Sequence, residues 1–262
     1  MYEHHRKALN NLVELLKQNP SFLAVITAGS VAQSKAKETS DVDVYLLVDD
    51  EEFERRKAED LLAYTNHDVC DYPEGYIDGK IINLHFLKSA SDHGSEPTRA
   101  SFVGSKAYFS RIPDLDNLLA RIPVYPEKNR DRDIKDFYAQ IYLYAFYFAG
   151  EAAKKDNTYL MSLAASNLVL FSGRVILTHN RILFPCHKGL MEAVTGAAEK
   201  PDNFVHQANS LLLTPTFEKC MDFAKMMLAF KDPEISFNQA ISRFVENNEW
   251  NWLDHEPPIA DR

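Results

Sequence analysis

The sequence predicts an α+β protein in two parts: an N-terminal mixed β-sheet flanked by helices (residues 1–112) and a C-terminal all-α helical bundle (residues 113–262). Strand-like apolar runs occur in the first part. From Ile134 onward, apolar residues recur with helical spacing and no convincing strand is found. Between the two parts, residues 112–133 hold three prolines and a dense run of charges, a composition typical of a domain boundary.

Helical and strand patterns alternate along the first part. The N-terminal helix is amphipathic and ends at Asn19-Pro20. In the last long strand, Asp78 and Lys80 share one face with Tyr76, because side chains alternate along a strand. The expected elements are a helix over residues 3–18, strands over 22–27, 41–48 and 76–87, a charged helix over 51–63, and a helix from Glu96-Pro97 followed by a short strand.

The second part reads as helices throughout. Its first helix is apolar nearly all round, which indicates a buried central position. Pro185 interrupts the helical pattern, which restarts at His187-Lys188. The expected helices cover residues 134–155, 158–179, 203–214, 216–230 and 234–248.

Composition describes an ordinary soluble globular protein, with 45% hydrophobic and 26% charged residues. A net charge of −9 argues against a surface that coats nucleic acid, which needs clustered Lys and Arg, but it would attract a cationic small substrate. The cysteines, Cys70, Cys186 and Cys220, lack metal-ligand spacing. No stretch approaches the length of a membrane span or has the core of a signal peptide. We therefore expect a reduced, cytoplasmic protein with no membrane partner.

The stretch from residue 25 to residue 48 carries the most informative chemistry. Gly29-Ser30 leaves a strand where a backbone without side chains lets an anion approach, and the Ser30 hydroxyl can bind phosphate oxygens. Asp41 and Asp43 are two apart on the next strand, so their carboxylates share one face about 7 Å apart at the backbone. Such a pair can hold one divalent cation or two. The arrangement predicts a site for a nucleotide and magnesium.

These residues resemble the DNA polymerase β-like nucleotidyltransferase superfamily, and its small-molecule branch in particular. That branch carries a Gly-Ser turn, a short helix and an Asp-x-Asp strand, matched here by Gly29, Ser30, Asp41 and Asp43, with Ser40 in the usual place before the first Asp. Lys35 stands where many members have a second glycine. The resemblance is specific over residues 22–50, moderate to residue 110, and architectural beyond.

The resemblance also implies a third carboxylate on a neighbouring strand. Asp78 is our choice, because a lone acid early in an apolar strand is costly without a role or a partner. Asp71 and Glu74, in the preceding turn, remain alternatives. In the helical part, Pro185 to Lys188 looks like the segment whose Lys reaches the triphosphate, although Gly189 replaces the usual aromatic residue.

The resemblance implies a Mg²⁺-dependent transfer of a nucleoside monophosphate, AMP from ATP, onto a hydroxyl of a small molecule, as in aminoglycoside and lincosamide nucleotidyltransferases. Asp41 and Asp43 would hold Mg²⁺, Asp78 would act as general base, and Gly29, Ser30, Ser40 and Lys188 would bind the nucleotide. Two alternatives stay open: transfer of AMP to a protein or a tRNA end, and a nucleotide-binding module with little turnover. The expected partners are a nucleotide and a small-molecule acceptor without nucleic acid. The acceptor's identity, the choice of nucleotide and homodimer formation stay open.

Overall fold

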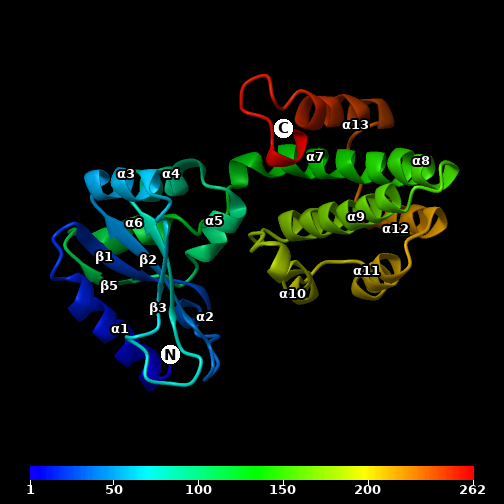
Figure 1. The fold of residues 1–262 in the computed structure, drawn as a ribbon. Helices are drawn as coiled ribbons and strands as arrows, with labels where there is room; N and C mark the ends of the chain where they lie inside the picture. Colours follow the sequence, from blue (N-terminus) through cyan, green and yellow to red (C-terminus); the bar gives the residue numbers. More distant parts are fainter. The chain divides into compact units, whose positions relative to one another are not determined.

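The computed structural model describes all residues, Met1 to Arg262, as an α+β protein of two compact units, Met1–Tyr125 and Pro126–Arg262 (Figure 1). The predicted fold class is confirmed. The division lies later in the chain than the expected one after residue 112, because α6 (Leu115–Arg121) belongs to the first unit. Leu115 and Leu119 of this helix are buried in the first unit's core, although the prolines around them suggested a linker.

The first unit contains a five-stranded mixed sheet with the strand order β3-β4-β2-β1-β5. At its centre, β1 pairs with β2 in antiparallel fashion, and β2 pairs with β4 in parallel. The edge strands β5 and β3 are antiparallel to β1 and to β4. The strands are β1 (Phe22–Thr27), β2 (Val42–Val48), β3 (Ala63–Asn66), β4 (Ile77–Ile82) and β5 (Ala107–Ser110).

In the first unit, two element boundaries differ from the sequence prediction by more than two residues. The last long strand was expected to reach residue 87, but β4 ends at Ile82 and α4 (Leu84–His93) follows. The Asn83 side chain accepts a hydrogen bond from the Phe86 N–H at 2.9 Å, which caps the new helix. The charged helix was expected over 51–63, but α3 (Asp50–Ala58) ends earlier, and the chain then forms the edge strand β3.

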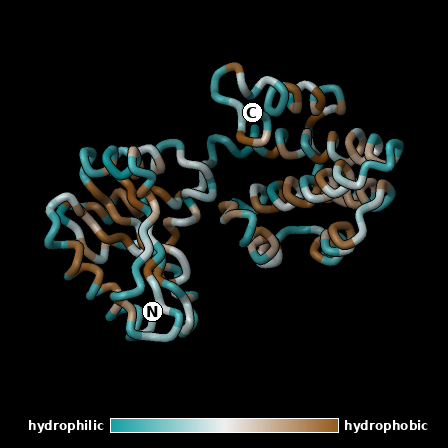
Figure 2. Tube along the Cα trace, in the orientation of Figure 1, coloured by the Kyte–Doolittle hydropathy of each residue, from teal (hydrophilic) through white to brown (hydrophobic).

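Alternation along the strands gives the sheet two different faces. On one face, apolar residues of β1, β2 and β4 pack against the buried side of α1 (Glu3–Leu16). On the other, Tyr45 and Leu47 pack against α4, α5 (Glu96–Ser101) and α6. Figure 2 shows hydrophobic residues along the central strands and hydrophilic ones on α3, which buries no residue. Asp43 lies two residues before Tyr45 on β2, so its side chain points to the same face as Tyr45, the second face.

The second unit is entirely helical, as predicted. At its core, Tyr138 is fully buried and donates its hydroxyl hydrogen to the Lys231 carbonyl at 2.9 Å. The α-helices are α7 (Arg130–Tyr142), α8 (Ala149–Lys154), α9 (Thr158–His179), α10 (Leu190–Gly196), α11 (Phe204–Leu213), α12 (Phe217–Phe230) and α13 (Phe237–Phe244). Residues Leu143–Phe148, between α7 and α8, are π-helical.

Helix α9 corrects one expectation about membrane spans. By length and composition alone, Thr158–His179 is long and apolar enough to cross a membrane, so the prediction that no stretch approaches that length is wrong. Half of its apolar window is buried inside the second unit, where Leu168 and Ile176 are fully buried. Burial of this extent is what a core helix also shows.

The packing of α1 gives a testable prediction. Leu12 of α1 is fully buried under the sheet, whereas Leu15 of the same helix is 50% exposed. We expect Leu12→Ala to lower the free energy of unfolding by about 2–5 kcal/mol, because a buried leucine leaves a cavity. Leu15→Ala should cost no more than about 0.5 kcal/mol. Urea denaturation followed by circular dichroism measures both, and equal losses would contradict the described packing.

Candidate functional site

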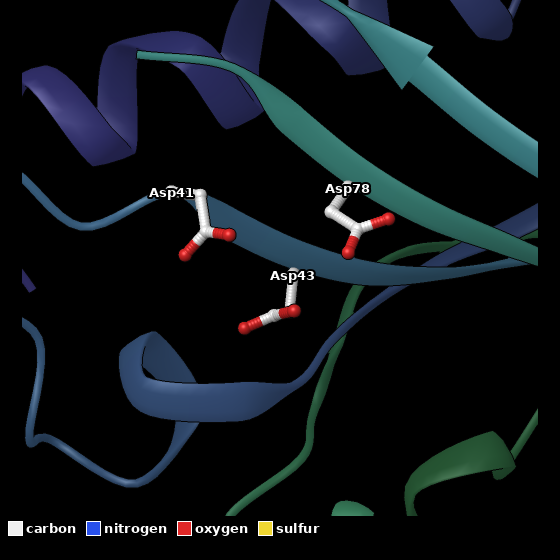
Figure 3. Close-up of side chains that lie close together, drawn as sticks. All are labelled: Asp41, Asp43 and Asp78. Carbon is white, nitrogen blue, oxygen red and sulfur yellow. The ribbon is translucent and has the colours of Figure 1, made fainter. Parts of the chain in front are cut away.

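Three carboxylates converge on the second face of the sheet. Asp43 on β2 and Asp78 on β4 are direct partners in the parallel register, and Asp41 precedes Asp43 by one full repeat of the strand. One ligand oxygen from each acid lies within 4.8 Å of the other two. Figure 3 shows Asp41, directly before β2, and Asp43 on β2 pointing to the same side, with Asp78 beside them on β4. The structure therefore brings together the three acids that the sequence singled out.

The chemistry of this cluster suits a hard divalent cation. Every donor atom is a carboxylate oxygen, the ligand type that Mg²⁺ prefers, and no thiol or imidazole that would favour a softer metal belongs to the cluster. Like charges at such separations repel each other by about 1 kcal/mol per pair in water, and by several times more near a protein surface. Asp41 and Asp43 are half-buried, whereas Asp78 is exposed. A bound cation would relieve the repulsion.

Gly29 brings the turn between β1 and α2 directly against Asp43. Its φ is +58°, a left-handed conformation, and a Cβ built on it would lie 1.8 Å from Asp43 Oδ2. The neighbouring Ala28 N–H donates to the Asp43 carbonyl at 2.9 Å. Only glycine fits here, because any side chain would overlap the carboxylate. Gly29 thus opens the single turn of α2 (Gly29–Ala32) beside the acids, with Ser30 following.

Ser40 has an observed role in holding the loop before Asp41. Its hydroxyl oxygen accepts a hydrogen bond from the Lys37 N–H at 2.9 Å. Its carbonyl accepts two more, from His5 Nε2 at 3.1 Å and from the Tyr72 hydroxyl at 2.9 Å. Burial raises the pKa of Tyr72 to about 12, so its hydroxyl stays protonated and can donate. The expected contact between Ser40 and the nucleotide stays a prediction.

Tyr76 is a site residue whose role the sequence did not reveal. Its hydroxyl lies close to the Asp41 carboxylate, and hydrogen bonding to that carboxylate together with its negative charge raises the pKa of Tyr76. The ring also lies against His67, with centroids 5.4 Å apart. The sequence does indicate that Tyr76 faces the site, since it precedes Asp78 by two residues and side chains alternate along a strand.

The remaining candidates lie outside the acid cluster. Asp71 is exposed and forms an ion pair with Lys7. Glu74 is exposed in the same turn, with a φ of +60°. Lys188 is an exposed residue of the second unit, in the short 3₁₀ turn His187–Gly189. Its contact with a triphosphate stays a prediction.

No protein-family model matches the chain, and no curated protein matches it in sequence. Among solved structures, it is similar to a nucleotidyltransferase-like protein from Exiguobacterium sibiricum 255-15. The sequence identity is 11%, the similarity covers 95% of this chain and 79% of that chain, and the TM-score is 0.49. Values this low carry no conclusion about what this chain does, which has to rest on its own residues.

The position of Gly29 gives the second prediction. Gly29→Ala should weaken the expected Mg²⁺-dependent binding of ATP at least about tenfold, because the new methyl group displaces the Asp43 carboxylate and the backbone conformation costs an alanine about 1–2 kcal/mol. Gly196→Ala is the matched control, since a Cβ there meets nothing within 4 Å. Calorimetric titration with ATP and Mg²⁺ measures both variants. If Gly29→Ala bound ATP with unchanged affinity, the close packing of the Gly29 turn against Asp43 would have no role in that binding.

The buried histidine of α1 gives the third prediction. His5 donates through Nε2 to a carbonyl, so its buried Nδ1, which has no hydrogen-bond partner, carries no proton. Burial lowers the pKa of His5 below its usual 6.5, and the neighbouring His4 lowers it further, outweighing the attraction of Asp41. Below about pH 6.5 the unfolded chain therefore binds a proton that the folded chain excludes, and stability falls as the pH drops toward the folded pKa.

We expect His5→Gln to reduce this loss. Thermal unfolding between about pH 7.5 and 5.5 should show a smaller drop in stability for His5→Gln than for the wild type. Replacing the exposed His93 by glutamine serves as control and should leave the wild-type trend in place. An identical pH dependence of stability in the wild type and in His5→Gln would show that His5 does not contribute to it.

Proposed function

We propose that the chain is a Mg²⁺-dependent nucleotidyltransferase that transfers a nucleoside monophosphate, AMP from ATP, to a hydroxyl group of a small molecule and releases pyrophosphate. The observation that supports it most is the convergence of Asp41, Asp43 and Asp78 within 4.8 Å of one another, with the Gly29 turn packed against Asp43. The motif resemblance to small-molecule nucleotidyltransferases supports the same reading.

Each group of residues has a defined task in this proposal. Asp41 and Asp43 would hold Mg²⁺, which when bound neutralises negative charge on the triphosphate oxygens. The backbone N–H groups of the Gly29-Ser30 turn and the Ser30 hydroxyl would bind the β- and γ-phosphates, since the first N–H groups of a helical turn have no partner within it.

Asp78 would take the proton from the attacking hydroxyl. The acceptor oxygen forms a bond to the α-phosphorus while the bond to the bridging oxygen breaks, and pyrophosphate leaves with the electron pair. Asp78 is the exposed member of the cluster, so an acceptor can reach it from solvent, whereas Asp41 and Asp43 are half-buried. The difference in exposure supports a division between a general base and cation ligands.

The fourth prediction tests this reaction. ATP, GTP, CTP and UTP are incubated with hydroxylated acceptors, with and without Mg²⁺, and pyrophosphate release is measured. We expect release that needs Mg²⁺ and is abolished in Asp41→Asn/Asp43→Asn. Asp78→Asn should slow release by about 10²–10⁴-fold, as for loss of a general base. Asp71→Asn, which changes an acid outside the cluster, should retain activity.

The other outcomes decide between the alternatives. Activity that survives in the double variant would remove the proposed mechanism. Mg²⁺-dependent binding of ATP without pyrophosphate release with any acceptor would indicate a nucleotide-binding module. Label that appears on a protein or tRNA rather than on a small molecule would indicate a regulatory transferase.

A further inference from the structure

We infer that the acceptor binds on the open β3–β4 part of the sheet face, and that Lys80 selects small hydroxylated acceptors bearing an anionic group, a carboxylate or a phosphate. The inference rests on the proposed function and names its substrate class.

The sheet order sets that direction. The Gly29 turn follows β1 and packs against Asp43 on β2, whereas Asp78 lies on β4, on the opposite side of β2 from β1. In phosphoryl transfer the attacking and leaving oxygens lie roughly in line on opposite sides of the phosphorus. Pyrophosphate held at the Gly29 turn therefore leaves toward β1, and the hydroxyl arrives over β4 and its neighbour β3.

The surface at that place is open to solvent. In the β3–β4 register, Thr65 pairs with Asp78 and Ala63 pairs with Lys80, so the four side chains share one face. All four are exposed. On the opposite face of β4, Ile77 and Ile81 are buried under α1. Because Ala63 and Thr65 are small, they leave room for a bound molecule beside the proposed base.

Lys80 is the positive charge of this surface. It lies two residues beyond Asp78 on the same face, about 7 Å along the strand. Its Nζ lies 5.9 Å from the centroid of the Tyr45 ring, so the side chain leans across the face toward β2. It forms no ion pair with Asp78 or with any other acid. An ammonium group placed there attracts an anionic substituent of the acceptor and repels a cationic one.

The positive charge of Lys80 favours the opposite kind of substrate from the one that the net charge of the chain favours. A net charge of −9 favours cationic substrates at long range. Beyond about 10 Å, however, salt screens exposed charges, so a group that touches the acceptor decides selectivity. Lys80 therefore disfavours polyamine acceptors such as aminoglycosides next to the base.

The fifth prediction uses three probes with the same carbon skeleton: glycerol 3-phosphate, glycerol and 3-aminopropane-1,2-diol. The full chain is first saturated with Mg²⁺ and α,β-methylene-ATP, so that the triphosphate site is filled, and each probe is then titrated by calorimetry. We expect glycerol 3-phosphate to bind at least about tenfold more tightly than the other two. Lys80→Gln should remove the preference, and Lys80→Glu should shift it toward the amine.

Lys57→Gln, which changes an exposed lysine of α3, is the matched control and should keep the preference. Equal binding of the three probes, or a preference that persists in Lys80→Gln, overturns the inference. It is also overturned if Lys80→Gln weakens α,β-methylene-ATP binding by the same factor, since Lys80 would then serve the nucleotide. Failure of the wild type to bind α,β-methylene-ATP with Mg²⁺ would instead overturn the proposed function, and this inference with it.

Discussion

The parallel pairing of β2 with β4 is the constraint on which the site depends. It places Asp43 directly beside Asp78, and the same register pairs Val42 with Ile77 and Leu46 with Ile81 on the opposite face. Those apolar pairs are buried under α1. A shift of one residue would expose them and turn Asp78 toward the core. The hydrophobic packing of α1 therefore specifies where the acids meet, although α1 contributes none of them.

The same helix also supports the loop that carries Asp41. His5 and Tyr72 bind the Ser40 carbonyl from positions far apart in the sequence, and Ser40 lies next to Asp41. The Tyr76 hydroxyl lies close to the Asp41 carboxylate itself. Carboxylates that repel one another move apart unless the backbone under them is fixed. These neutral hydrogen-bonding groups fix the loop without cancelling the negative charge that a cation needs.

Local patterns predicted the parts of the fold that depend on neighbours in sequence. Gly29, Asp41 and Asp43 were found because a strand alternates its side chains and only glycine tolerates the turn. The apolar run after Ile82 has the pattern of a strand, and its helical start depends on one side chain, Asn83, which caps the Phe86 N–H. The roles of His5 and Tyr76 could not be predicted, since each arises from a contact across the fold.

On the second face of the sheet, which carries the acids, the residues of β2 and β4 become less polar over three paired positions. Asp43 and Asp78 lie at the polar end, Tyr45 and Lys80 come next, and Leu47 and Ile82 lie at the apolar end under α4. The Tyr45 ring stacks on Phe102 with centroids 4.5 Å apart, and its hydroxyl hydrogen-bonds the Ser101 hydroxyl at 2.6 Å. Tyr45 therefore belongs both to the core and to the surface beneath Lys80. Because the Tyr45 ring is held from two sides, the Lys80 side chain lies over a rigid support. In the proposed acceptor site, selectivity would therefore depend on the packed sheet rather than on a mobile loop.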